Sequence, residues 1–75
     1  MNDELKRTIA GELGVDPAEL TSDKRLQDFE SWDSVMVLVM MVILGNAAGK
    51  EILPEEMAEL RTFGDIEALV ARKQS

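Results

Sequence analysis

The sequence contains no cysteine, no histidine and no tyrosine, and it has only two prolines and one tryptophan. The lack of cysteine excludes a disulfide framework and removes the thiol as a nucleophile. The lack of histidine removes the side chain that titrates near neutral pH, so carboxylates are the only general bases left. We therefore expect no catalytic residue, no metal site and no enzyme, and a fold stabilised by packing alone.

Long apolar stretches are also missing. The N-terminal segment MNDELKRTIAGELG has no apolar core of the kind found in secretory signals. The run Val35–Leu44 is the longest apolar segment, and it reaches about half of the roughly 20 residues that span a bilayer. The expectation is a cytoplasmic protein with no membrane span.

Positive charge is scarce, with 8 basic against 15 acidic residues and a net charge of −7. Such a chain repels nucleic acid and anionic membranes, so we expect no nucleic-acid partner and favour basic protein partners. The alternative is that the charge only keeps a small protein in solution. At 75 residues the chain predicts one domain, 1–75, near the lower limit of unaided folding.

One helix and a long loop are predicted before residue 33. The first helix runs from Asp3 to Leu13, with Asn2 or Asp3 as its cap and Gly14 as a left-handed stop. Residues 15–32 form a long loop, opened by a helical turn at Pro17. We expect spaced apolar residues to hold this loop against the core: Val15, Leu20, Leu26 and Phe29.

The second helix is predicted from the Asp33 cap to about Gly45, with Gly45, Asn46 and Gly49 as the residues that end it. The valine-rich run could instead be a strand, but no second strand of similar strength exists to pair with it. A short helix follows at Glu55–Leu60, and a last helix begins after Thr62 with Phe63 packed inward. The fold class is all-α, a four-helix bundle with three longer helices, one short helix and a long first loop.

Ser34 is the candidate functional residue. It follows Asp33, whose carboxylate can accept hydrogen bonds from the amides of the first helical turn. The N-terminus of a helix also accommodates a phosphate group, because its N–H groups are unpaired and its dipole is positive there. The local residues leave two interpretations open: Asp-Ser as a capping pair, or Ser34 as a site of modification.

The wider sequence resembles the acyl carrier protein family, the phosphopantetheine-dependent carrier domains. The resemblance lies in an acidic chain of this length with three segments: Trp32-Asp33-Ser34-Val35, Ile52-Leu53-Pro54-Glu55-Glu56 and Leu60-Arg61-Thr62-Phe63-Gly64-Asp65-Ile66. It implies that Ser34 carries 4′-phosphopantetheine, attached from coenzyme A by a phosphopantetheinyl transferase. It also implies that Asp33 caps the helix and takes part in recognition by the transferase.

The resemblance implies a discrete acyl carrier protein, a phosphoprotein of lipid metabolism that is not itself an enzyme. It would hold acyl groups as thioesters and present them to acyl-loading and acyl-processing enzymes of fatty-acid, polyketide or related biosynthesis. Two alternatives remain. One is an aminoacyl or peptidyl carrier, and the other is an unmodified helical module that binds partners through the apolar face of its second helix.

The second helix departs from the family pattern, because no charged residue lies between Val35 and Leu44. By the family's arrangement four residues face inward: Val37, Met40, Met41 and Leu44. The exposed strip beside Ser34 is then formed by Val35, Met36, Val39 and Val42. Such a strip predicts a partner-binding face, with a wider core or a dimer interface as alternatives.

The predicted partner-binding residues are those of the strip, the tryptophan before the serine and two acids after Pro54: Trp32, Val35, Met36, Val39, Val42, Glu55 and Glu56. We expect a monomer, with weak dimerisation through the apolar face of the second helix as the alternative.

Overall fold

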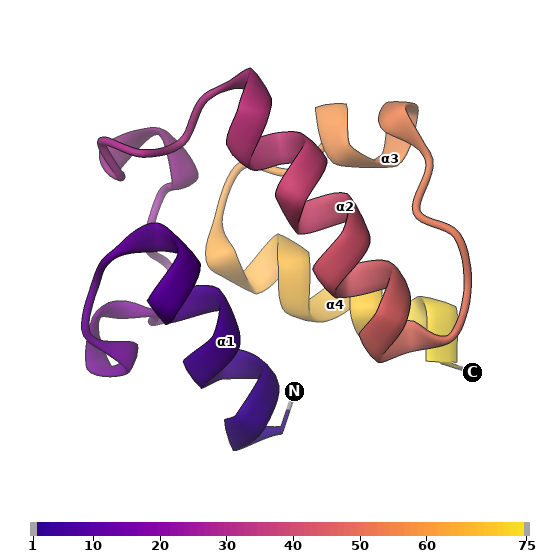
Figure 1. Cartoon of the computed structure of the whole chain (residues 1–75), viewed down its shortest axis with the longest axis horizontal. Coiled ribbons are helices and arrows are strands. Elements are labelled where there is room, and N and C mark those ends of the chain that lie inside the picture. The colour runs from indigo at the N-terminus through magenta and orange to yellow at the C-terminus, as the bar shows by residue number, and fades with distance from the viewer. Residues whose placement is uncertain (1, 75) are drawn as a thin grey trace.

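The computed structural model describes residues 2–74, and within them it contains helices and turns but no named strand. Four α-helices are joined by loops, and α2 crosses α4 with α1 and α3 against its sides (Figure 1). Their bounds are α1 (Asp3–Leu13), α2 (Ser34–Ala48), α3 (Pro54–Ala58) and α4 (Phe63–Gln74). Two 3₁₀ turns, Pro17–Glu19 and Leu26–Asp28, lie in the long first loop. The all-α prediction, with one short helix, is confirmed.

Helix α1 has the predicted bounds, because both of its ends carry strong local signals. The Asn2 side-chain oxygen accepts a hydrogen bond from the Leu5 amide at 2.7 Å. Gly14 ends the helix in the left-handed conformation, with φ of 72°. Asn2 rather than Asp3 is therefore the cap, and Asp3 lies in the first turn, where its charge suits the helix dipole.

Helix α2 begins as predicted and ends later than predicted. The Asp33 carboxylate accepts a hydrogen bond from the Met36 amide at 2.8 Å. The predicted end near Gly45 is wrong, because the helix continues to Ala48. Gly49, the last of the three residues predicted to end it, is the actual cap, with φ of 72°. Gly45 lies inside the helix at a point where the chain returns close to it: a Cβ there would lie 3.3 Å from the Lys50 carbonyl oxygen. Close packing accounts for the glycine at this position.

The two C-terminal helices differ slightly from their predicted ranges. Helix α3 begins at Pro54 and ends at Ala58, one residue early at its start and two residues short of the expected Leu60. Thr62 caps α4 as predicted: its hydroxyl accepts a hydrogen bond from the Asp65 amide at 3.2 Å. The Asp65 carboxylate in turn accepts from the Thr62 amide at 3.1 Å, which completes a reciprocal cap.

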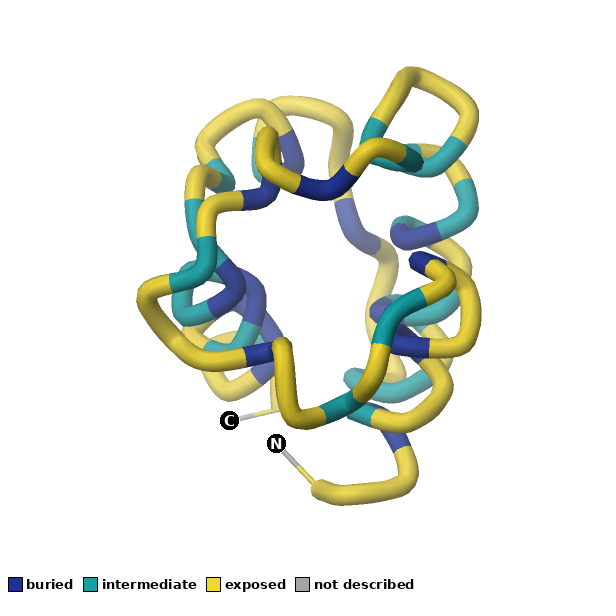
Figure 2. The backbone as a smooth tube through the Cα atoms, turned by 90° about the vertical axis from the view of Figure 1, so that its left-hand side faces the viewer, coloured by how far each residue is buried: buried dark blue, intermediate teal, exposed yellow. Residues whose placement is uncertain are grey.

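The core lies between the four helices and the first loop, and the buried parts of the chain line the centre in Figure 2. Leu20, Leu26 and Phe29 are buried and Val15 packs partly against the core, so the loop is held as predicted. Phe63 is fully buried, also as predicted. The remaining buried side chains come from every helix and from the loop before α3, which contributes Ile52: Leu5, Ile9, Ala10, Leu13, Met40, Leu44, Ile52, Met57, Ile66, Leu69 and Val70.

The first loop is joined to the start of α4 by three backbone hydrogen bonds that the sequence did not predict. The Leu26 amide donates to the Arg61 carbonyl at 2.9 Å, and the Phe63 amide donates to the Lys24 carbonyl at 2.8 Å. The Gly64 amide donates to the Ser22 carbonyl at 2.9 Å. These bonds position the loop that leads into α2.

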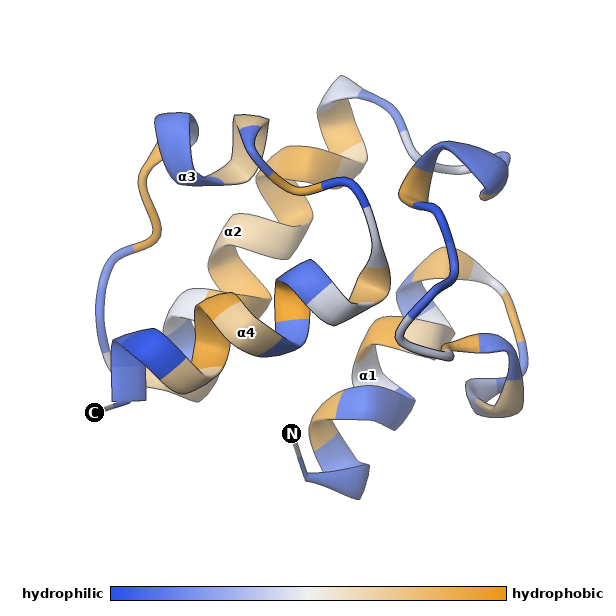
Figure 3. Ribbon diagram, turned by 180° about the vertical axis from the view of Figure 1, so that it is seen from behind, coloured by the Kyte–Doolittle hydropathy of each residue, from blue (hydrophilic) through white to orange (hydrophobic). Residues whose placement is uncertain are grey.

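The faces of α2 differ in part from the family arrangement. The helix is apolar along much of its length (Figure 3), and Met40 and Leu44 are buried as expected. Val35 and Val42 are exposed as expected. The expected exposure of Met36 is wrong, because this side chain is half-buried and packs against the core. Val39 is also only half-exposed, whereas Leu38, which the prediction left out, is exposed.

None of the helices within residues 2–74 is both long enough and apolar enough to cross a bilayer.

Candidate functional site

Ser34 is the first residue of α2, and its side chain is exposed. The loop before it is anchored on two sides. The Ser31 hydroxyl donates to the Leu13 carbonyl at 3.0 Å, and the half-buried Trp32 ring packs against the core. These two contacts fix the end of the loop, and the exposed Ser34 follows directly after it at the start of α2.

The local electrostatics of Ser34 follow from the helix start. The first amides of a helix have no partner inside it, and Asp33 satisfies that of Met36. The amides of Ser34 and Val35 lie in the same turn, at the positive end of the helix dipole. A phosphodiester on Ser34 fits here, because the hydroxyl is accessible and the helix end favours an anion, with the Asp33 charge as the opposing contribution.

The two acids of α3 lie in different environments. Glu55 is exposed, whereas the Glu56 carboxylate forms an ion pair with Lys73 at 2.8 Å and accepts a hydrogen bond from the Leu53 amide at 2.9 Å. The hydrogen bond from Lys73, and then that from Leu53, lower the pKa of Glu56 below its usual value. Glu56 thus links α3 to α4, and its predicted contact with a partner competes with this ion pair.

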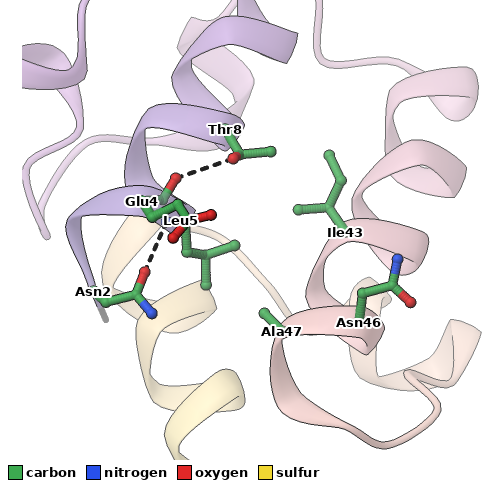
Figure 4. Close-up of a pocket in the computed structure, with 7 residues that line it drawn as sticks. All are labelled: Asn2, Glu4, Leu5, Thr8, Ile43, Asn46 and Ala47. Atoms are coloured by element: carbon green, nitrogen blue, oxygen red, sulfur yellow. Dashed lines mark hydrogen bonds between the residues drawn. The ribbon is translucent and has the colours of Figure 1, made fainter.

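A cleft of about 370 Å³ opens between α1 and α2. In Figure 4 its sides are formed by Leu5 and Thr8 of α1 and by Ile43 and Ala47 of α2. Its polar groups are already partly engaged, because the Thr8 hydroxyl donates to the Glu4 carbonyl at 3.0 Å. Ile43 lies nine residues beyond Ser34, about 13 Å along the helix, so this cleft is separate from the serine.

Within residues 2–74 no group of three or more histidine, cysteine, aspartate or glutamate side chains could hold a metal ion. Of the residues predicted from the sequence, the structure brings together Trp32, Asp33, Ser34 and Val35 at the start of α2. It puts Val39 and Val42 further along the same helix, and Glu55 and Glu56 on α3. Leu38 is the surface residue that the sequence missed, and no sequence signal could have found it, since its neighbours are apolar on every side.

Comparisons with the sequences of known proteins identify the family. The family model described as "Phosphopantetheine attachment site" matches residues 3–70. The acyl carrier protein MbtL of Mycolicibacterium paratuberculosis is 35% identical over 91% of this chain and 76% of its own length. An acyl carrier protein of Rhodococcus erythropolis is 31% identical over 96% of this chain and 79% of its own length.

Longer proteins match as well. The non-reducing polyketide synthase rads2 of Floropilus chiversii is 38% identical over 92% of this chain, which corresponds to 3% of the length of the synthase. A second polyketide synthase, rdc1 of Metacordyceps chlamydosporia, is likewise matched over only 3% of its length. The match is thus to one small domain of these synthases.

The matched range covers most of this chain and includes Ser34 at the start of α2, so the chain has the length and fold of a single carrier domain. This chain belongs to the phosphopantetheine attachment-site family, whose domains carry acyl groups on 4′-phosphopantetheine and are themselves non-catalytic.

Proposed function

We propose that Ser34 is the attachment residue and that this chain carries acyl groups as thioesters on 4′-phosphopantetheine. The observation that supports the assignment is the position of Ser34: an exposed hydroxyl at the first residue of α2, inside the matched range 3–70. When bound, the group supplies a terminal thiol, which the chain itself lacks because it contains no cysteine.

The residues around Ser34 each have a role in this proposal. The Ser34 oxygen attacks the phosphorus of coenzyme A that bears the pantetheine. A new O–P bond forms, the pyrophosphate P–O bond breaks, 3′,5′-ADP leaves, and a base of the transferase takes the hydroxyl proton. Asp33 caps the first turn of α2 by accepting the hydrogen bond of the Met36 amide, and Ser34 beside it is exposed. Asp33 is also our candidate for recognition by the transferase.

The proposed partners are a phosphopantetheinyl transferase and acyl-loading and acyl-processing enzymes of fatty-acid, polyketide or related biosynthesis. On this proposal the chain performs no catalysis of its own, because the reactive groups belong to those enzymes. The modification consumes coenzyme A, so we propose a cytoplasmic location. We also propose that the carrier is a monomer. Of the predicted partner contacts, Trp32, Met36 and Val39 are only partly accessible, and Glu55 is the freer of the two acids.

The direct test is intact-mass spectrometry after incubation with coenzyme A, magnesium and a transferase of broad specificity. We expect the wild type to gain the mass of one phosphopantetheine and Ser34→Ala to gain none. Ser22→Ala is the matched control, since Ser22 is another exposed serine, and it should be modified normally. An unmodified wild type across several transferases contradicts the proposal and favours the unmodified interaction module.

The cargo is tested separately on the modified protein. The relatives named above are acyl carrier proteins and polyketide synthases, which favours an acyl cargo. Loading by acyl-transferring enzymes, with none by amino-acid-adenylating enzymes, is the expected result. The reverse pattern would make the chain an aminoacyl or peptidyl carrier.

A further inference from the structure

The cleft between α1 and α2 lies on the side of α2 that faces away from Ser34. Ile43 follows Ser34 by nine residues, about two and a half turns of an α-helix, so the two side chains leave α2 in opposite directions. A group bound in the cleft therefore leaves Ser34 uncovered. The volume of the cleft, about 370 Å³, is within the usual range of binding pockets.

The cleft has apolar walls and a polar rim. Leu5 of α1 faces Ile43 and Ala47 of α2 (Figure 4). On the rim, the Thr8 hydroxyl donates its proton to the Glu4 carbonyl at 3.0 Å, so only its lone pairs remain for a ligand. The walls therefore suit an aliphatic chain, and this part of the rim suits a hydrogen-bond donor.

The charge on the rim indicates which donor fits. Among the described residues that line the cleft, Glu4 is the only charged one, and its side chain is exposed. Within residues 2–74 its carboxylate forms no ion pair. The two basic residues of α1, Lys6 and Arg7, line a different hollow together with Pro17 of the first loop. An unpaired negative charge beside an apolar wall is complementary to a cation that carries an aliphatic chain.

We propose that the cleft binds an arginine or lysine side chain of a partner protein. The aliphatic stem lies along Leu5 and Ile43, and the cationic head reaches Glu4. A free amine is disfavoured, because one exposed ion pair strengthens binding only severalfold, whereas a side chain that belongs to a larger interface needs no more. A second copy of the chain is disfavoured as well, since both copies carry −7.

The position of the cleft gives this contact its use. Because the cleft and Ser34 lie on opposite sides of α2, a partner held at the cleft and an enzyme at Ser34 can contact the chain at the same time. The inference does not rest on the proposed function, since Ser34 is not among the lining residues and the contact is testable on the unmodified chain.

The test is an NMR titration of the isotope-labelled chain with N-acetyl-arginine N-methylamide, which reproduces an arginine side chain of a protein. We expect saturable shifts of the Thr8, Ile43 and Ala47 amides, with a Kd of about 1–10 mM for a single side-chain contact. N-acetyl-norleucine N-methylamide keeps an aliphatic stem without the charge, and it should bind about threefold more weakly. Guanidinium chloride at the same concentration lacks the stem and should cause no saturable shift of these amides.

Glu4→Gln removes the charge of the rim and keeps the size of the side chain. It should weaken binding of the arginine probe about threefold and leave the Kd of the norleucine probe unchanged, which also shows that the variant is folded. Glu55→Gln is the matched control, because Glu55 is another exposed glutamate, on α3 and outside the cleft. This control changes the net charge equally and should change neither Kd. The chain with phosphopantetheine on Ser34 should bind the arginine probe as the unmodified chain does.

Several results would overturn the inference. Shifts confined to residues outside the cleft contradict it, as do equal Kd values for the arginine and norleucine probes. An equal loss of affinity in Glu4→Gln and Glu55→Gln reduces the effect to net charge and contradicts it too. A Kd below about 10 µM for n-butylguanidinium would assign the cleft to a free small cation.

The modified chain gives a separate outcome. A large loss of affinity after modification of Ser34 would mean that the attached arm occupies the cleft, and it would contradict the separation of the two sites. A chain that takes no phosphopantetheine refutes the proposed function alone, because the titrations of the unmodified chain and of Glu4→Gln still decide the inference.

Discussion

Replacement of Gly64 by alanine tests how tightly the first loop is packed against α4. Gly64 lies in the first turn of α4, where its amide donates to the Ser22 carbonyl at 2.9 Å. A Cβ on residue 64 would lie 2.8 Å from that carbonyl oxygen and 3.2 Å from the Ser22 Cβ. The nearest obstacle is a backbone atom, so relief requires the loop itself to move.

Two effects of opposite sign decide the magnitude. Alanine is the better helix former, which favours the variant by about 0.5–1 kcal/mol. Overpacking of a close contact costs about 1–3 kcal/mol, and a lengthened Gly64–Ser22 hydrogen bond costs about 1 kcal/mol more. We expect a net loss of about 1–3 kcal/mol. For a domain of this size that lowers Tm by roughly 5–15 °C.

Gly11→Ala is the matched control. Gly11 lies inside α1, it is exposed, and an added Cβ would meet nothing within 4 Å. The same chemical change should therefore raise the free energy of unfolding by about 0.5–1 kcal/mol. Urea melts followed by circular dichroism measure both variants. The packing argument fails if Gly64→Ala is as stable as the wild type, or if the two variants shift in the same direction.

Two further predictions concern side chains near the site. In urea melts the free energy of unfolding of Asp33→Ala should be about 1 kcal/mol lower than that of the wild type, because the Met36 amide loses its acceptor. Asp33→Asn should retain most of this stability, and equal stability of the wild type and both variants would contradict the cap. The pKa of Glu56 is lowered by Lys73 and the Leu53 amide, so its contribution is present at neutral pH and is lost as pH falls below about 4.5, the usual value. Glu56→Gln should therefore lose less stability than the wild type on acidification, and parallel pH profiles would refute this.

The sequence alone determined the features that depend on neighbouring residues. Asn2 and Gly14 delimit α1 because a side-chain cap and a left-handed glycine act within a few residues. Asp33 before Ser34 marks the start of α2 for the same reason. The segments around Ser34, Pro54 and Phe63 were also sufficient to indicate the carrier family, since a spaced set of short motifs is more specific than any one of them.

Other features required the tertiary structure. Gly45 looks like a stop in the sequence, yet α2 continues through it to Ala48, and a Cβ there would lie 3.3 Å from the Lys50 carbonyl oxygen of the returning chain. Glu56 looks like a free surface acid in the sequence. In the structure Lys73, in the last turn of α4, forms an ion pair with it, a contact between residues distant in sequence.

The face of α2 is the clearest case. Every position from Val35 to Leu44 is apolar, so the hydrophobic pattern has no phase to indicate which side is buried. Only the packing of α1, α3 and α4 around it turns Met40 and Leu44 inward and leaves Leu38 outside. The sequence thus determined that Ser34 begins an uncharged helix. The surface which that helix offers to partners was decided by the surrounding helices, because burial depends on what packs against a residue and not on its polarity alone.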